Sequence, residues 1–295
     1  MTLLGDLSRD LRYATRVLAR SPSFTLVAVV VLALGIGATS AIFSFMSAVF
    51  LKPLPFADAN RLVTLWIDQS ATGGGARMQV APGYYADWRL ARSFESMTAI
   101  EPSSFNLTSD GGEPERLAGV RATPNLFETI GLQPILGRTF DAEGAGNDGI
   151  VVSEGFWFRR FGADPAAIGS TITLDGSPHT IVGVVPRDFR FPAGENEIFI
   201  PTAFAPDVLA RRSPYSWYIV AKLKHDVALK QAQAEMRAMA ATLEAESPQT
   251  GRGATPNVVL LRDVLTGTAR PTLLGLLGAV CQDCAKETWR SRERS

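Results

Sequence analysis

The sequence predicts an α+β fold (mixed α/β) that follows one membrane-spanning helix. Three observations support this prediction. Residues 21–51 form an uncharged, largely apolar run. Short segments rich in Val, Ile and Thr recur between residues 62 and 261. Residues Asp226–Glu246 repeat apolar side chains at helical spacing. With 46% hydrophobic and 20% charged residues among 295, the chain can bury a core, which excludes wholesale disorder.

The apolar run at residues 21–51 predicts a transmembrane helix. A helix needs about 20 apolar residues to cross ~30 Å of hydrocarbon, and a backbone in lipid must pair its own polar groups. Two alternatives stay open. A cleaved signal peptide would have an apolar core of only ~7–15 residues. A buried helix of a soluble protein rarely runs this long without a charge.

The residues that flank this run predict its orientation. Lys52 follows it closely, whereas several arginines precede it: Arg9, Arg12, Arg16 and Arg20. The positive-inside rule therefore places the N-terminus in the cytoplasm and the main domain on the extracytoplasmic, periplasmic side. We expect a single-pass protein of the cell inner membrane, with the lipid bilayer as its immediate partner.

Residues 1–20 predict a cytoplasmic amphipathic helix. Apolar side chains recur every three or four positions with arginines between them: Leu4, Leu7, Leu11, Ala14 and Leu18. This pattern is typical of a helix that lies on the inner membrane surface. A plain cytoplasmic helix is the alternative.

Small residues follow one face of the predicted transmembrane helix. They are Ala33, Gly37, Ala41, Ser44 and Ala48. Small side chains at this spacing let a second membrane helix approach closely, so they predict a helix-packing face. Small residues are also common in any membrane helix, and that simpler interpretation stays open.

Residues 52–268 predict a folded domain. Its strand candidates are Leu62–Ile67, Met97–Phe105, Leu117–Ala122, Ile150–Ser153, Thr171–Leu174, His179–Val185, Glu197–Ile200, Trp217–Leu223 and Val258–Leu261. Asp175-Gly176 joins two of these strands as a two-residue hairpin. The helix candidates are Pro82–Arg92, Ser153–Phe161 and Asp226–Glu246. In the second helix, Ser153 is the expected N-cap and Gly162 the expected stop.

Two strand–helix–strand units predict two α/β lobes with a β-rich insert between them. The first unit contains helix Pro82–Arg92, and the second contains helix Asp226–Glu246. Aromatic side chains are expected in the core rather than around a ligand: Tyr85, Trp88, Phe94, Phe156, Trp157, Phe158 and Phe161.

The sequence predicts no catalytic, metal-binding or cofactor-binding residue. The 29 Lys and Arg residues balance 29 Asp and Glu residues, so the chain lacks the basic excess of a nucleic-acid binder. His179 and His225 have no neighbouring ligand residues, and both are expected at the surface or the core edge. Cys281 and Cys284 form a lone C-x-x-C spacing without the context of a redox or zinc site.

Ordered motifs in this sequence resemble FtsX/MacB-type ABC transporter permeases. The motifs are Leu34–Phe43, Leu51–Phe56, Asn60–Val63, Asp87-Trp88, Ser93–Glu95, Pro124–Phe127, Leu136–Phe140, Trp157–Gly162, Ile168-Gly169, Thr180–Pro186 and Phe189–Pro192. The resemblance covers residues 1–275 and is closest to the duplicated orphan permease group. It implies a MacB-like periplasmic core domain, with porter-like α/β lobes and a β-rich insert.

The resemblance also implies a function and partners. Members of the family are permease subunits without catalytic residues, and they transmit motion or export substrates. They act as dimers or pseudo-dimers, so other permease helices or a second permease half are expected beside this chain. A cytoplasmic ABC ATPase drives them.

Residues 269–295 depart from the family. Pro271–Val280 begins a second apolar segment, but it reaches only about 15 Å, and a charged tail follows it. We therefore expect a permease truncated after the first periplasmic domain by a lost reading frame, which is not transport-competent alone. A deliberately shortened variant is the alternative.

Two other functions stay open at the level of the sequence. One is a membrane-tethered extracytoplasmic binding or adaptor module that acts without an ATPase. The other is an extracytoplasmic hydrolase on a signal anchor, which the lack of a nucleophile–base motif argues against.

Overall fold

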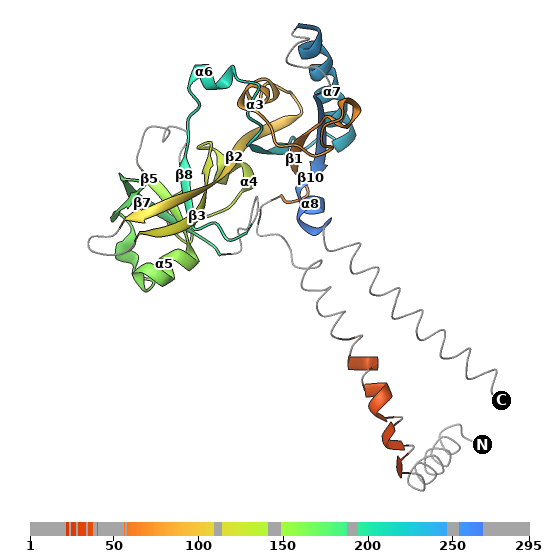
Figure 1. Cartoon of the computed structure of the whole chain (residues 1–295), viewed down its shortest axis with the longest axis vertical. Helices are drawn as coiled ribbons and strands as arrows, with labels where there is room; N and C mark the ends of the chain where they lie inside the picture. Colours follow the sequence, from red (N-terminus) through yellow and green to blue (C-terminus); the bar gives the residue numbers. More distant parts are fainter. Residues whose placement is uncertain are drawn as a thin grey trace, which may run out of the picture. The chain divides into compact units, whose positions relative to one another are not determined.

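A computed structural model of the 295-residue chain describes most of the predicted domain and part of the apolar run (Figure 1). The described residues are 22–23, 25–27, 29–33, 35–37, 40, 56, 58–108, 114–140, 149–187, 194–246 and 254–267. The chain divides into two compact units, Met1–Pro53 and Leu54–Ser295.

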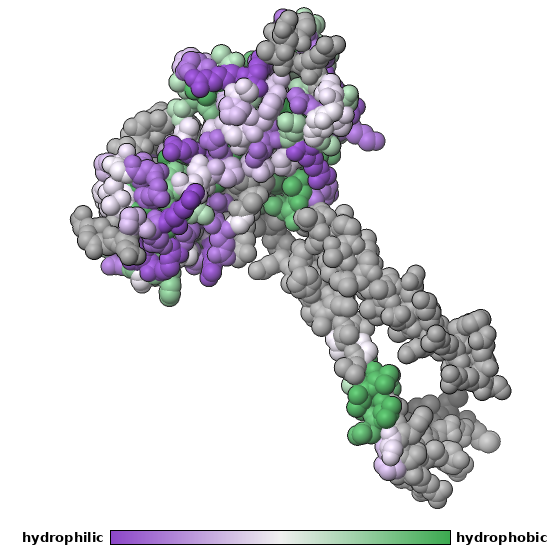
Figure 2. Space-filling view, in the orientation of Figure 1, coloured by the Kyte–Doolittle hydropathy of each residue, from purple (hydrophilic) through white to green (hydrophobic). Residues whose placement is uncertain are grey.

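The described residues of the first unit are helical, and they carry their large apolar side chains on the outside. These side chains are 48–69% exposed, and Figure 2 shows them in green: Leu26, Val27, Val29, Val30, Val31, Leu32 and Ile36. Among the described residues, no helix combines the length and apolarity needed to cross a membrane. The predicted helix 1–20 and the rest of segment 21–51 lie outside the described residues.

The second unit contains the domain. Its strands are β1 (Leu62–Asp68), β2 (Phe94–Thr108), β3 (Glu115–Ala122), β4 (Leu136–Gly137), β5 (Gly149–Ser153), β6 (Thr171–Leu174), β7 (Ser177–Val185), β8 (Ile198–Pro201), β9 (Tyr218–Leu223) and β10 (Thr255–Leu260). Its helices are α3 (Pro82–Trp88), α4 (Leu126–Ile130), α5 (Glu154–Phe161), α6 (Pro206–Leu209), α7 (Leu229–Glu246) and α8 (Leu261–Gly267). Short 3-10 turns cover Ser70–Thr72 and Pro165–Ala167.

The strands form one mixed sheet in the order β10-β1-β9-β2-β3-β8-β5-β7-β4, and β6 pairs with β2 and β7. The units β1-α3-β2 and β9-α7-β10 interleave in this sheet: β9 lies between β1 and β2, and β1 lies between β9 and β10. Each of these neighbouring pairs is antiparallel, so the two strands of each unit run parallel to each other. This is a split βαβ arrangement. The two predicted strand–helix–strand units therefore share one sheet and do not form separate lobes.

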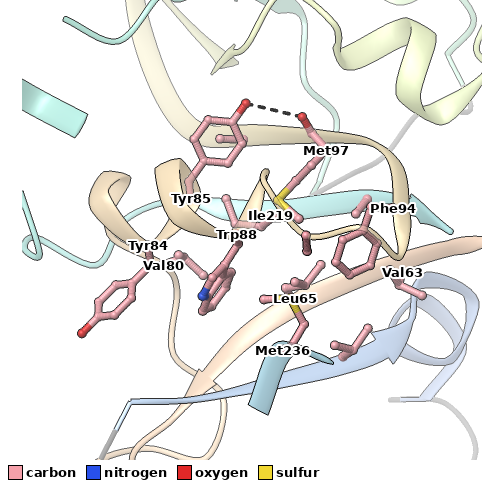
Figure 3. Close-up of a cluster of buried hydrophobic side chains, with 14 of the residues drawn as sticks. Val63, Leu65, Val80, Tyr84, Tyr85, Trp88, Phe94, Met97, Ile219 and Met236 are labelled. Carbon is pink, nitrogen blue, oxygen red and sulfur yellow. Dashed lines mark hydrogen bonds between the residues drawn. The ribbon is translucent and has the colours of Figure 1, made fainter. Parts of the chain in front are cut away.

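Helices α3 and α7 cover one face of this four-stranded part (Figure 3). Alternate residues of β1 point into the covered face, and Val63, Leu65 and Ile67 have no exposed surface. Trp88 of α3 and Met236 of α7 meet the same cluster and are 1% and 0% exposed. One core can serve both helices because the interleaved order places them on the same side of the sheet.

The β-rich insert extends the same sheet beyond β2 and β3. Strands β3 and β8 pair in parallel, as do β5 and β7, and β6 and β7 form a hairpin. Asp175 and Gly176 turn this hairpin with φ of 48° and 82°, so the prediction of a two-residue turn is confirmed. A further core lies here, with Phe105, Val152 and Phe156 almost fully buried.

Two predictions for the domain need correction, and one helix was not predicted. Residue Leu261 begins α8 and is not strand, because its buried side chain turns into a cluster with Phe56 and Leu62. Phe158 is 69% exposed, because α5 packs only one side on the sheet and that side is taken by Phe156. Helix α4 was not predicted, since a five-residue helix shows too little periodicity.

Candidate functional site

The chain enters and leaves the domain at the same end of the sheet. The register pairs Val63, near the start of β1, with Leu260, at the end of β10. Phe56, Leu62 and Leu261 are buried together in one cluster on the face of the sheet opposite α7. The two connections are also joined by a hydrogen bond of 2.7 Å that Arg262 donates to the Asn60 side chain. We call this region the entry–exit junction.

Arg61 lies at the centre of the entry–exit junction. Its guanidinium donates to the Leu223 carbonyl from Nε at 2.8 Å and from Nη2 at 2.6 Å. The Leu223 amide in turn donates to the Arg61 carbonyl at 2.9 Å. The Arg61 side chain is only 15% exposed. These bonds fix the start of β1 to the end of β9, which is 162 residues away in the chain.

Two carboxylates and a second cation complete the charge network. Asp58 accepts from Arg61 at 3.2 Å, and Glu95 also pairs with Arg61. The Lys222 Nζ lies 3.2 Å from the Asp58 carboxylate and 3.5 Å from that of Glu95. Each carboxylate therefore meets both cations. The hydrogen bond from Lys222 lowers the pKa of Asp58, and the hydrogen bond from Arg61 lowers the pKa of Glu95.

His225 also contacts this network. Its Nε2 lies 2.9 Å from Nη1 of Arg61. A guanidinium can only donate, so a hydrogen bond in this arrangement requires Nε2 to accept. His225 is exposed, which agrees with the surface position predicted for it. His179 is half-buried in β7, and its Nδ1 is a buried atom without a hydrogen-bond partner in the described structure.

Two side chains of α7 fasten this helix to the sheet. Gln233 donates to the Pro256 carbonyl and accepts from the Val258 amide, both at 2.7 Å. These are outward-facing backbone groups of the edge strand β10, so Gln233 closes that edge. Glu235 accepts from the amides of Arg92 and Ser93 at 2.7 and 2.9 Å. Burial alone would raise the pKa of Glu235, but the hydrogen bonds from the Ser93 side chain and from the two amides lower it below its usual value.

A cleft of about 490 Å³ opens at the start of α5. Its lining combines an exposed aromatic ring, Phe158, with both signs of charge: Glu154, Arg159, Arg187, Glu195 and Glu197. Ser153 caps the helix, as predicted, by accepting from the Phe156 amide at 3.2 Å. Arg159 is already paired with Glu197 and Glu115. Among the described residues that line this cleft, no nucleophile lies next to a general base.

The residues predicted to form the helix-packing face are only partly described. Ala33 and Gly37 are helical, and a Cβ added at Gly37 would meet nothing within 4 Å. Ala41, Ser44 and Ala48 lie outside the described residues. The packing face therefore stays a prediction. Within the described residues, no group of three His, Cys, Asp or Glu side chains could hold a metal ion.

Sequence reasoning missed the entry–exit junction. Arg61, Glu95 and Lys222 belong to three different strand ends, so no local pattern links them. One signal was present, since the resemblance motifs Asn60–Val63 and Ser93–Glu95 include two of the three residues.

Comparisons with known proteins agree with this architecture. A family model described as MacB-like periplasmic core domain matches residues 25–239, more than two thirds of the chain. No curated protein matches the chain.

Solved structures match the chain at low sequence identity. One is a domain described as part of a permease protein from Porphyromonas gingivalis, with a TM-score of 0.55 and 14% identity over 70% of this chain and 93% of that chain. Another is the periplasmic region of MacB from Actinobacillus actinomycetemcomitans, with a TM-score of 0.52 and 14% identity over 77% of this chain and 97% of that chain. The extracellular domain of YknZ, a noncanonic ABC-type transporter from Gram-positive bacteria, has a TM-score of 0.47 and 14% identity over 67% and 99% of the two chains.

Proposed function

Since the chain belongs to the MacB-like periplasmic core domain family, we propose that it serves as a permease component of an ABC-type transporter. In this role residues 21–51 anchor it in the inner membrane, and residues 52–268 form an extracytoplasmic domain. The domain transmits motion that a separate cytoplasmic ATPase drives. The fold that this domain shares with a domain described as part of a permease protein from Porphyromonas gingivalis supports this role.

The observation that carries this proposal is the entry–exit junction. A domain that transmits motion must receive it through its chain connections and pass it to its sheet. Here both connections meet at one end of the sheet, where Arg61 and Lys222 tie β1, β2 and β9 together. A movement of either connection would therefore shift the sheet as one body, because close-packed interiors have low compressibility and transmit strain.

The exposed apolar helix in the first unit supports the anchor. Its large side chains have no protein surface over them in the described residues, and contact with water would oppose this arrangement. Hydrocarbon around the same side chains favours it. We infer from the arginine bias of residues 1–20 that this end faces the cytoplasm.

Cysteine labelling tests the topology. In a chain with Cys281→Ser and Cys284→Ser, Ala76→Cys places a thiol in an exposed loop of the domain. A membrane-impermeant maleimide added to cells with a permeabilised outer membrane should label Ala76→Cys and leave Arg16→Cys unlabelled. The reverse pattern, or recovery of the intact chain as a freely dissolved protein, contradicts the proposal.

Co-purification tests the transporter role. The tagged full chain, isolated from membranes, should recover an ATPase subunit in a nucleotide-dependent manner. A stable complex with envelope proteins that never contains an ATPase would instead favour the adaptor module.

The junction itself can be tested in that complex. Arg61→Gln should remove the ATP-dependent change in protease sensitivity of the domain, while Arg77→Gln, in an exposed loop, should preserve it. If Arg61→Gln kept the ATP-dependent change in protease sensitivity, the entry–exit junction would not be needed for the transfer of motion to the domain.

A further inference from the structure

The turn between α3 and β2, residues 89–93, exposes a leucine between two arginines, and we call it the Leu90 turn. Leu90 is 73% exposed, the highest value among the large apolar side chains of the domain that the structure describes. Arg89 and Arg92 are exposed on either side of it, and neither has an ion-pair partner among the described residues. The turn therefore combines an apolar side chain in water with positive charge that the described part of the chain leaves unpaired.

The backbone of the Leu90 turn is held firmly against its neighbours. Glu235 of α7 accepts from the amides of Arg92 and Ser93 at 2.7 and 2.9 Å. The Ser93 carbonyl accepts from the Lys224 amide at 3.0 Å. The exposed side chains thus stand on a backbone that is already ordered. Binding of another surface to Leu90 would for this reason cost little main-chain entropy.

A third cation lies beside the Leu90 turn. It is Lys224, in the connection from β9 to α7, which is exposed and has no ion-pair partner in the described part of the chain. Residues 89–93 and 224–228 together contain three cations and one carboxylate, that of Asp226. The nearby Glu235 directs both of its oxygens at the amides of the turn. The surface around the exposed leucine is therefore basic.

The Leu90 turn lies at the end of the sheet where the chain enters the domain. Leu223 of β9 pairs with Phe94, the first residue of β2. The preceding residue, Lys222, pairs with Leu62, the first residue of β1. Two strand spacings of about 4.8 Å therefore separate the start of β1 from the start of β2. The exposed loop that contains Ala76 follows the opposite end of β1.

We propose that the Leu90 turn docks on the surface of the phospholipid bilayer. In this arrangement Leu90 enters the layer of headgroups and upper acyl chains, and the three cations bind headgroup phosphates. The inference rests on the proposed function, which ends the membrane anchor at residue 51. Only residues 52–55 separate this position from Phe56, and four residues span at most ~14 Å. The bilayer surface is thereby close to the end of the sheet that carries the turn.

Two features favour a bilayer over an acidic protein as the occupant. Arginine and lysine side chains can reach phosphates with their charged ends while a neighbouring leucine enters an apolar layer. A stable protein interface buries about 1,200 Å² or more, and a five-residue turn with one large apolar side chain offers far less. A bilayer that is tethered to the domain needs fewer contacts, because the anchor keeps its effective concentration high.

Fluorescence in vesicles tests the contact. In the full chain with Cys281→Ser and Cys284→Ser, Leu90→Cys carries an environment-sensitive NBD fluorophore, and Ala76→Cys is the matched control. In vesicles that contain phosphatidylglycerol, the emission from Leu90→Cys should shift to the blue and be quenched by lipids with a nitroxide near the headgroup. The emission from Ala76→Cys should do neither. Equal quenching of the two probes, or no quenching of the Leu90→Cys probe, overturns the proposal.

Charge removal tests the role of the arginines. Arg89→Gln combined with Arg92→Gln should remove most of the quenching of the Leu90→Cys probe, as should vesicles of phosphatidylcholine alone. Arg77→Gln combined with Arg116→Gln removes the same charge from exposed positions elsewhere in the domain and should have no effect. If the quenching survives the loss of both arginines of the turn, they do not recognise lipid phosphates and the proposal fails. Equal protease resistance verifies that each variant remains folded.

A probe in the anchor separates this inference from the proposed function. Val31→Cys, in the first unit, should be quenched by lipids with a nitroxide deep in the acyl chain. Quenching of the Val31→Cys probe without quenching of the Leu90→Cys probe overturns the docking alone and assigns the basic surface to an acidic protein. Absence of quenching in both variants contradicts the anchor itself.

Discussion

The two units of this protein use the same apolar residue types in opposite ways. In the helical residues of the first unit, Leu32 and Val31 are 63% and 62% exposed. In the domain, Leu62 and Val63 are fully buried. Because the hydrophobic effect acts on any apolar surface in water, the outward arrangement is stable only where another apolar medium covers it. The difference teaches that the domain supplies its own apolar surroundings, whereas the described helical residues of the first unit need an apolar covering, which the proposed membrane anchor would supply.

Charges in the exposed helix should have the largest effect. Replacing Val31 and Leu32 together by Arg should strongly reduce membrane insertion, since each arginine near a bilayer centre costs about 2.5–3.5 kcal/mol. The fraction of chain retained in membranes after an alkaline wash measures this. Replacing the same two residues by Phe is the control and should leave retention unchanged. If the arginine variant is retained in membranes as well as the unaltered chain, lipid does not cover the apolar side chains of the first unit.

Removal of a buried ring should have the next largest effect. Trp88→Ala should destabilise the domain by about 3–5 kcal/mol, because it leaves a cavity beneath α3 and α7. Leu90→Ala, only two residues away and 73% exposed, should change stability by no more than about 0.5 kcal/mol. Urea unfolding of the full chain in detergent, followed by tryptophan fluorescence or circular dichroism, compares the two. Similar losses would argue against the buried position of Trp88.

The hydrogen bonds at the sheet edge should have a smaller effect. Gln233→Ala leaves the Val258 amide and the Pro256 carbonyl without their partner, with an expected cost of about 1–3 kcal/mol. Gln231→Ala, on the exposed side of the same helix, is the matched control. Hydrogen exchange at the Val258 amide should accelerate in Gln233→Ala alone. Equal protection of this amide in both variants would mean that α7 does not close the edge.

Acid should weaken the ion pairs of the entry–exit junction, and of the predictions made here this one has the smallest effect on stability. The pKa values of Asp58 and Glu95 are lowered in the folded state, so their contribution to stability is present above the pKa of the unfolded carboxyls. It is lost as the pH falls through the lowered values. Both side chains are nearly half exposed, so solvent screening keeps the contribution small.

Thermal unfolding measured between pH 7 and pH 3 tests this direction. Glu95→Gln should show a shallower loss of melting temperature on acidification than the unaltered chain. Glu101→Gln, farther along β2, should follow the unaltered chain. If the melting temperature of Glu95→Gln fell more steeply with acid than that of the unaltered chain, the ionised Glu95 carboxylate would not stabilise the folded state.

Local backbone features, namely turns, helix ends and the inner face of α7, could be predicted from the sequence. The Asp175-Gly176 turn, the Ser153 cap and the stop at Gly162 follow from backbone conformations that neighbouring residues impose, and each is found where it was expected. The apolar spacing of α7 likewise identified its inner face, with Ala232 and Met236 buried. Such features depend on contacts within a few residues, so one sequence contains all the information that they need.

Contacts between distant segments were decided by the tertiary structure alone. The interleaving of β9 between β1 and β2, the bonds from Arg61 to Leu223 and the outward position of Phe158 all depend on which strands pair and which helix face the sheet covers. A single sequence carries strand propensity but not strand partners, because any of several strands could satisfy the same backbone groups. The sequence therefore determined the elements and the apolar run, while folding determined which charges and which surfaces came together.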